Sequence, residues 1–83
     1  MSNISIYTTS FCPYCIQAKR LLNKKNITFT EINVGKDPEK RAEMMQKSRQ
    51  RTVPQIFNGD THVGDCMQIH GFESQGTLDD LLA

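Results

Sequence analysis

The sequence lacks the features that mark membrane, secreted or nucleic-acid-binding proteins. No stretch approaches the roughly 18 consecutive apolar residues of a membrane span. The first residues alternate polar and apolar side chains, whereas a secretion signal joins a basic segment to an apolar one. The formal net charge is only +1, so no overall field attracts nucleic acid or a membrane surface. We therefore expect a cytoplasmic protein that binds neither nucleic acid nor membrane.

Proline, glycine and cysteine are also scarce. The 83 residues include three prolines and five glycines, and 37% of them are hydrophobic, which is typical of a globular chain and not of a disordered one. A chain of this length supports one core, so we expect a single domain over residues 1–83 that acts as a monomer. Three cysteines without a secretion signal disfavour a disulfide framework and favour catalytic or metal-binding thiols.

The spacing of apolar residues predicts a strand, a helix and a second strand in the first half of the chain. Alternation over residues 3–7 and 27–34 indicates the two strands. Between them a helix is predicted to begin at Pro13 and to stop near Asn26. Its apolar stripe consists of Cys15, Ala18, Leu21 and Leu22. This order of elements predicts that the two strands are parallel.

A second helix and a hairpin are predicted next. Asp37 is expected to cap the helix and Pro38 to occupy its first position, with Ala42 and Met45 facing inward. Asn58-Gly59-Asp60 then indicates a hairpin turn between two short strands. The predicted fold class therefore includes an antiparallel pair as well as a parallel one.

Helical spacing returns near the C-terminus. One helical piece is predicted to begin near Met67, and a second follows Gly76 with Thr77 as its cap. The summed order, β-α-β-α-β-β-α, predicts an α/β fold in which a four-stranded mixed sheet is flanked by helices.

Two cysteines in the stretch "CPYC" carry the strongest chemical signal. Cys12 falls at the N-cap of the first predicted helix, with Pro13 in its first turn. Backbone N–H groups that lack helical partners point toward the Cys12 sulfur and, with the helix dipole, stabilise a thiolate relative to a thiol. We therefore predict that Cys12 is the nucleophile of a thiol–disulfide exchange and is negatively charged near neutral pH.

Cys15 is the predicted partner of Cys12 in this exchange. It lies one helical turn further in, on the same face, where two sulfurs can approach to the distance of a disulfide. Because it lies deeper and further from the free N–H groups, we expect a more ordinary pKa for Cys15. We predict that it resolves the mixed disulfide that Cys12 forms first.

The thiols have a second interpretation, as ligands in a metal or iron–sulfur binding module. Cys12, Cys15, Cys66 and His70 are acceptable zinc ligand types. The gap of about 50 residues between the two halves of this set is longer than in common zinc modules. We therefore expect no metal. The other histidine, His62, is expected to be a surface residue of the hairpin.

Three motifs in this order resemble the glutaredoxins, in particular the small bacterial dithiol type. They are "CPYC" at Cys12–Cys15, "TVP" at Thr52–Pro54 and "GDC" at Gly64–Cys66, and the resemblance covers essentially the whole chain. It implies a thioredoxin-like fold and an enzyme that reduces protein disulfides and glutathione mixed disulfides with glutathione as co-substrate. A dithiol electron donor that is reduced by a flavoprotein reductase remains an alternative.

The resemblance also implies a glutathione site. The Val53–Pro54 bond is expected to be cis, with the Val53 backbone pairing with the extended tripeptide as an added strand would. The N-terminus of a helix at Cys66 and Met67 is expected to hold the γ-glutamyl carboxylate. The implied glutathione-binding residues are Tyr14, Thr52, Val53, Pro54, Asp65, Cys66 and Met67.

Three positions differ from the family's pattern. Thr9 stands where a lysine commonly meets the glycine carboxylate of glutathione, and Arg49 or Arg51 is a candidate substitute. Met67 replaces an acidic residue near the glutathione amine, and Asp65 replaces a glycine. Three roles are open to the Asp65 carboxylate: it caps the helix, it meets the amine, or it repels the γ-glutamyl carboxylate.

Overall fold

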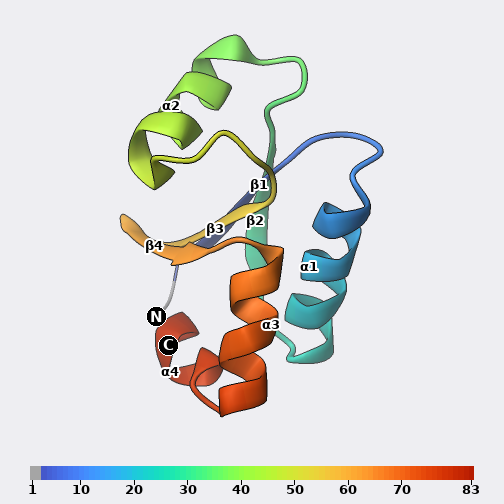
Figure 1. Cartoon of the computed structure of the whole chain (residues 1–83), viewed down its shortest axis with the longest axis vertical. Helices are drawn as coiled ribbons and strands as arrows, with labels where there is room; N and C mark the ends of the chain where they lie inside the picture. The colour runs from blue at the N-terminus through green and yellow to red at the C-terminus, as the bar shows by residue number, and fades with distance from the viewer. Residues whose placement is uncertain (1–2) are drawn as a thin grey trace.

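The helices and strands follow the predicted order, and the C-terminal helical region is divided in two (Figure 1). The structure is a computed structural model that describes residues 3–83. Its elements are β1 (Ile4–Thr8), α1 (Pro13–Lys24), β2 (Phe29–Asn33), α2 (Pro38–Ser48), β3 (Gln55–Asn58), β4 (Thr61–Gly64), α3 (Cys66–Gln75) and α4 (Leu78–Leu82). None of the helices described over residues 3–83 combines the length and apolar character that a membrane crossing requires.

The four strands form one mixed sheet in the order β2-β1-β3-β4. β1 is parallel to β2 and antiparallel to β3, and β3 is antiparallel to β4. The predicted hairpin turn is confirmed between β3 and β4, where Gly59 has a positive φ of 60°. Glycine adopts this left-handed conformation without the steric penalty that a side chain would cause. The mixed sheet of the predicted fold class is therefore confirmed.

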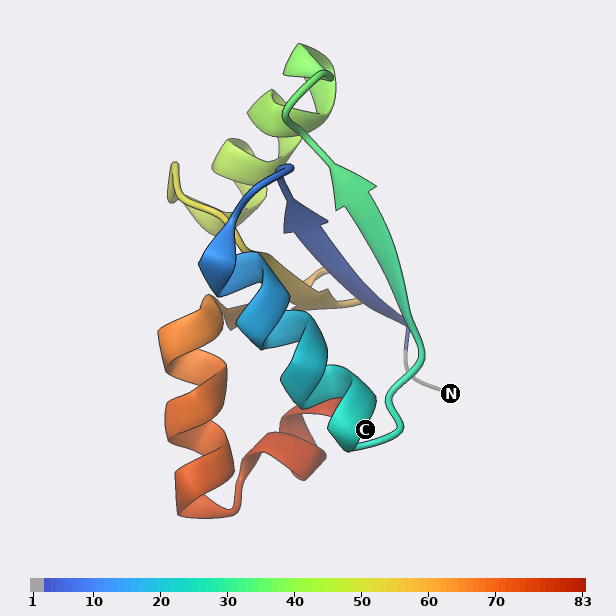
Figure 2. The ribbon, with the colours of Figure 1, turned by 90° about the vertical axis from the view of Figure 1, so that its right-hand side faces the viewer.

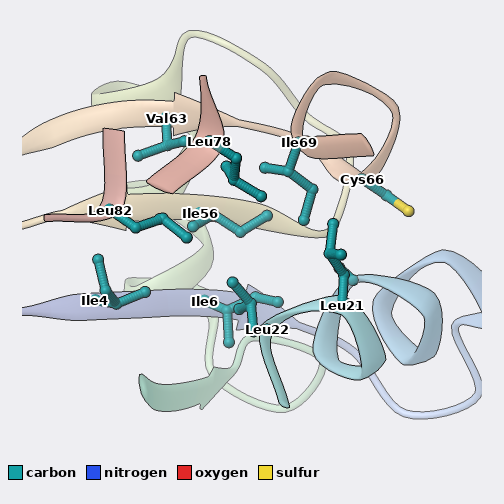
Figure 3. Packing of buried hydrophobic residues seen from close by; sticks show 11 residues of the cluster. Ile4, Ile6, Leu21, Leu22, Ile56, Val63, Cys66, Ile69, Leu78 and Leu82 are labelled. Atoms are coloured by element: carbon teal, nitrogen blue, oxygen red, sulfur yellow. The ribbon is translucent and has the colours of Figure 1, made fainter. Parts of the chain in front are cut away.

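Helices cover both faces of the sheet (Figure 2). One hydrophobic cluster joins β1 residues Ile4 and Ile6 to α1, α3 and α4. Figure 3 shows this cluster, with Leu22 and Ile69 among the side chains that meet over the sheet. A second cluster lies on the opposite face, where Tyr7 packs with Met44 of α2. The alternation along β1 thus sends neighbouring side chains into separate clusters.

The start of α2 is as predicted, but its buried face is not. The Asp37 side chain accepts a hydrogen bond from the Lys40 N–H over 3.1 Å, as an N-cap does. Ala42, for which the sequence predicts an inward position, is exposed, and Met45 is only partly buried. Met44 and Ser48 are the buried residues of α2. The packing of α2 against Tyr7 and its neighbours decides which residues of the helix are buried. Helical spacing alone does not show this.

The two C-terminal helices are separated by a left-handed residue, Gly76, with φ of 76°. Thr77 occupies the N-cap position of α4, but its hydroxyl makes no capping bond to that helix. The Thr77 hydroxyl instead donates a hydrogen bond to the Phe72 carbonyl over 3.3 Å. Thr77 therefore ties α4 to the end of α3.

Candidate active site

Cys12 lies at the N-cap of α1, as predicted, with Pro13 at the first helical position. Its extended backbone, with φ of −108° and ψ of 106°, joins the loop after β1 to the helix. The Cys15 N–H donates a hydrogen bond to the Cys12 sulfur over 3.2 Å. The Cys12 side chain is partly exposed. The sulfur therefore combines access to solvent with a backbone hydrogen-bond donor in the first turn of the helix.

Cys15 is buried at the first turn of α1, with 2% of its surface exposed. Burial, as the largest cause, and the hydrogen bond with Cys12 together raise the pKa of the Cys15 thiol to about 12, although a backbone hydrogen bond with Thr9 lowers it. The expectation of a more ordinary pKa for Cys15 is therefore wrong. Sequence spacing places Cys15 one turn inside the helix but does not show how deeply the folded chain buries it.

A groove of about 320 Å³ lies beside Cys12. The Cys12 thiol donates a long hydrogen bond, 3.9 Å, to the Val53 carbonyl, which belongs to the groove wall. The Val53–Pro54 peptide bond is cis, as the resemblance implied. The residues that line the groove are Tyr14, Thr52, Val53, Pro54, Asp65, Cys66 and Met67. These are the seven residues that the resemblance implies for glutathione, drawn from three separate segments of the chain.

The side chain of Gln55 holds the segment before Pro54 by hydrogen bonds. The sequence analysis did not predict this role. Gln55 is fully buried at the start of β3, and its amide donates to the Thr52 carbonyl and to the Gln50 side-chain oxygen, each over 3.0 Å. Its own side-chain oxygen lies 2.7 Å from Nε2 of His62. A glutamine directly after Pro54 and before the apolar Ile56 and Phe57 was the available signal.

His62 is half-buried and is not the surface residue that we expected. Its ring lies 5.0 Å from the Phe57 ring, centroid to centroid, and burial lowers the pKa of His62. The Gln55 oxygen that faces Nε2 is an acceptor, so Nε2 carries the proton and donates it. His62 therefore supports Gln55 from the neighbouring strand β4.

Asp65 caps α3, which confirms the first of its three open roles. Its carboxylate accepts a hydrogen bond from the Gln68 N–H over 2.9 Å, and the Gln68 side chain accepts one from the Asp65 N–H over 3.0 Å. This reciprocal capping box leaves the N–H groups of Cys66 and Met67, the first two of the helix, outside its bonds. Met67 is 83% exposed at the groove.

Cys66 is buried at the first position of α3, at the edge of the hydrophobic cluster (Figure 3). Burial raises the pKa of the Cys66 thiol, and the nearby charges of Asp65 and Cys12 raise it further. His70 Nδ1 lies 3.5 Å from the Cys66 sulfur and 2.8 Å from the Cys66 carbonyl oxygen. Within residues 3–83, no three His, Cys, Asp or Glu side chains come together as a metal site.

Arg49 and Arg51, the candidate substitutes for the missing lysine, do not line the groove. Both line a separate pocket between α2 and the segment that leads to β3. Thr9 instead follows β1 directly, and its backbone lowers the pKa of Cys15.

Comparison with known proteins identifies the family. The sequence matches the model of the glutaredoxin family over residues 4–63. A glutaredoxin of Pseudomonas aeruginosa is 51% identical over 83 residues, which cover 100% of this chain and 99% of that protein. The chain belongs to the glutaredoxin family. It is a glutathione-dependent thiol–disulfide oxidoreductase, and neither the metal-binding alternative nor the flavoprotein-dependent one is favoured by these matches.

Solved structures agree with the thioredoxin-like fold. The solution structure of a glutaredoxin from Brucella melitensis superposes with a TM-score of 0.87 at 48% identity, covering 99% of this chain and 89% of that one. A buckwheat glutaredoxin–glutathione complex superposes with a TM-score of 0.88 at 25% identity, covering 98% of this chain and 76% of that one. The predicted fold class is confirmed.

Proposed function

We propose that Cys12 is the nucleophile and Cys15 the resolving thiol of this oxidoreductase. The observation that carries the proposal is the partly exposed Cys12 sulfur at the start of α1. This sulfur accepts a hydrogen bond from the Cys15 N–H and adjoins the groove. A thiolate in such a position attacks a disulfide sulfur without a separate catalytic base. Cys15 is too buried to meet an external disulfide first.

The first half of the reaction reduces the target. The Cys12 thiolate attacks one sulfur of the target disulfide, and the other target sulfur leaves as a thiolate that takes up a proton from water. Cys15 then loses its proton and attacks the Cys12 sulfur, so that a Cys12–Cys15 disulfide forms and the target leaves with two thiols. Once Cys12 is in the mixed disulfide, its charge no longer raises the pKa of Cys15. The pKa of Cys15 therefore falls after the first step, although burial still raises it.

The second half uses two glutathione molecules. The first attacks the Cys12 sulfur, which leaves a Cys12–glutathione mixed disulfide and a Cys15 thiol. The second attacks the glutathione sulfur of that adduct, which releases glutathione disulfide and the Cys12 thiolate. A glutathionylated protein gives the same Cys12–glutathione mixed disulfide, because Cys12 attacks its glutathione sulfur and the protein thiolate leaves.

We propose that the groove beside Cys12 holds the glutathione moiety. The related buckwheat glutaredoxin was solved as a glutathione complex, which supports this assignment. In the groove of this chain the Val53 backbone would pair with the tripeptide, Tyr14 would flank it, and the first N–H groups of α3 would hold the γ-glutamyl carboxylate. Thr52, Pro54 and Asp65 complete the walls.

The proposed substrates are disulfide-containing and glutathionylated proteins. We propose that the protein acts on them as a monomer in the cytoplasm. Exposed thiols stay reduced in that compartment. Size-exclusion chromatography of the reduced protein would test the proposed monomer.

A matched pair of variants tests the two thiol roles. Cys12→Ser removes the only partly exposed thiol of the described residues and should abolish turnover of both a glutathionylated protein and a protein disulfide. Cys15→Ser, the same change one turn away, should keep much of the deglutathionylation, because glutathione itself resolves the Cys12 adduct. It should lose most of the protein disulfide reduction. A Cys12→Ser variant that still turned over either substrate would reject the assignment.

A further inference from the structure

A pocket of about 580 Å³ lies between α2 and the segment that leads to β3, outside the groove at Cys12. Its walls are Arg41, Met45, Gln46, Arg49, Gln50 and Arg51, which we call the arginine pocket. We propose that the arginine pocket docks an acidic segment of the protein substrates whose disulfides Cys12 attacks. The proposal rests on the proposed function, since it names a class of partner for that reaction.

The charges of the arginine pocket are not neutralised by the protein itself. The ion pairs on α2 join Lys40 and Lys47 to Glu43, and Lys47 also to Asp60. Among the ion pairs found over residues 3–83, none includes Arg41, Arg49 or Arg51. Three guanidinium groups therefore gather at one pocket while the lysines of the same helix are paired. Because the net charge of the chain is only +1, this local field is not part of a generally basic surface.

The backbone holds the arginines in place around the pocket. Nη2 of Arg41 donates a hydrogen bond to the Arg51 carbonyl over 3.2 Å, which ties α2 to the segment after it. Arg49 ends α2 in the left-handed conformation, with φ of 60°, and its N–H donates to the Met45 carbonyl over 2.8 Å. A non-glycine residue in this conformation turns the chain sharply, and here the turn brings Arg49 and Arg51 to the pocket that Arg41 lines.

The arginine pocket adjoins the proposed active site along the chain. Arg51 is followed directly by Thr52, Val53 and Pro54 of the groove, so the Cα atoms of Arg51 and Pro54 lie at most roughly 11 Å apart. Gln50, another wall residue, accepts the Gln55 amide that also holds Thr52. An extended substrate segment of a few residues therefore spans from a disulfide at Cys12 to the arginine pocket.

The side chains of the arginine pocket are chemically suited to bind a peptide carboxylate. Guanidinium groups bind carboxylates through paired hydrogen bonds with a fixed geometry. The other walls are a methionine and two glutamines, which suit the apolar and amide parts of a polypeptide. The pocket is also larger than the neighbouring groove of about 320 Å³. These features favour an acidic protein segment over the single glycine carboxylate of glutathione.

Two disulfide-bonded peptides that differ only in charge test this proposal. One carries glutamates on both sides of its disulfide, and the other carries glutamines in the same places. The wild-type protein should reduce the glutamate peptide with the higher kcat/KM, and the ratio should fall toward one at about 0.5 M salt. Arg49→Gln should lower the ratio about two- to fivefold, as expected for one partly exposed ion pair. Arg41→Gln should do the same, and the glutamine peptide reports whether each variant remains folded and active.

Arg20→Gln is the matched control, because it removes the same charge from an exposed position on α1 that lies outside both pockets. It should leave the ratio unchanged. Equal ratios for the wild type and both pocket variants would overturn the docking proposal while the proposed function stood. A raised KM for glutathione in the Arg49→Gln variant with an unchanged ratio would also overturn it, because the pocket would then serve glutathione. Failure of the wild type to reduce either peptide would reject the proposed function as well.

Discussion

The backbone N–H of Cys15 donates a hydrogen bond to the Cys12 sulfur over 3.2 Å, so a single turn of α1 links the two thiols of the active site. The same residue that supports the Cys12 sulfur through its backbone keeps its own sulfur buried. The two cysteines thus differ in depth and in exposure although they are only three positions apart. This asymmetry gives the proposed exchange its order, with Cys12 attacking first.

The raised pKa of Cys15 predicts that its alkylation depends steeply on pH. Because the pKa is raised to about 12, the thiolate fraction of Cys15 is very small at neutral pH and grows as the pH rises toward that value. Iodoacetamide should therefore modify Cys12 well before Cys15 at pH 7, and labelling of Cys15 should accelerate throughout the alkaline range. Mass spectrometry of the labelled peptides measures both rates. Labelling of Cys15 that levelled off near pH 9 would contradict this prediction.

In Cys12→Ser, the pKa of Cys15 should fall but stay above its ordinary value of 9.0. Burial, the largest cause of the shift, remains in this variant, whereas the charge of Cys12 is lost. The same labelling experiment over the same pH range measures the change. A variant in which Cys15 titrated as a free thiol would show that Cys12, and not burial, dominates the shift.

The capping box at α3 allows the charge of Asp65 to be separated from its structural role. Asp65→Asn keeps an oxygen that accepts the Gln68 N–H, and asparagine is as good an N-cap as aspartate. The variant should therefore keep its free energy of unfolding within about 0.5 kcal/mol. Loss of the carboxylate beside the proposed γ-glutamyl site should lower the KM for glutathione about two- to fivefold, since like charges no longer repel.

Asp65→Ala is the companion variant for this test, because it removes both the charge and the cap. It should also lower the KM for glutathione, but it should cost about 0.5–2 kcal/mol in the free energy of unfolding. Urea denaturation and steady-state kinetics measure the two effects. A higher KM in Asp65→Asn would indicate that this carboxylate binds the glutathione amine instead of opposing the carboxylate.

The buried amide of Gln55 predicts a linked loss of stability and of substrate binding. Gln55→Ala leaves the Thr52 carbonyl and His62 Nε2 without their present partner, which should cost about 1–3 kcal/mol in the free energy of unfolding. Because Thr52 and Val53 line the groove, the KM for glutathione should rise as well. Gln17→Ala, at an exposed position of α1, is the control and should change the free energy of unfolding by less than about 0.5 kcal/mol. Equal stability in the two variants would contradict the role given to Gln55.

Local features of the sequence were sufficient to predict the order of the elements. The caps at Cys12 and Asp37 and the turn at Gly59 depend on neighbouring residues, and all three are found where the sequence placed them. The side chains of α2 show where this reasoning ends. A helical pattern with apolar residues on two adjacent stripes does not reveal which one faces the sheet, and the structure buries Met44 and not Ala42.

The sequence by itself determined the strand and helix order, the N-cap position of Cys12 and, through three short motifs, the family. These follow from hydrogen bonds and periodicities that span only a few residues. The tertiary structure decided how deeply Cys15 is buried, that Gln55 and His62 support the Thr52 segment, and that three arginines share a pocket. Burial and partner choice depend on residues that are distant in the chain and meet only when the sheet and helices pack together.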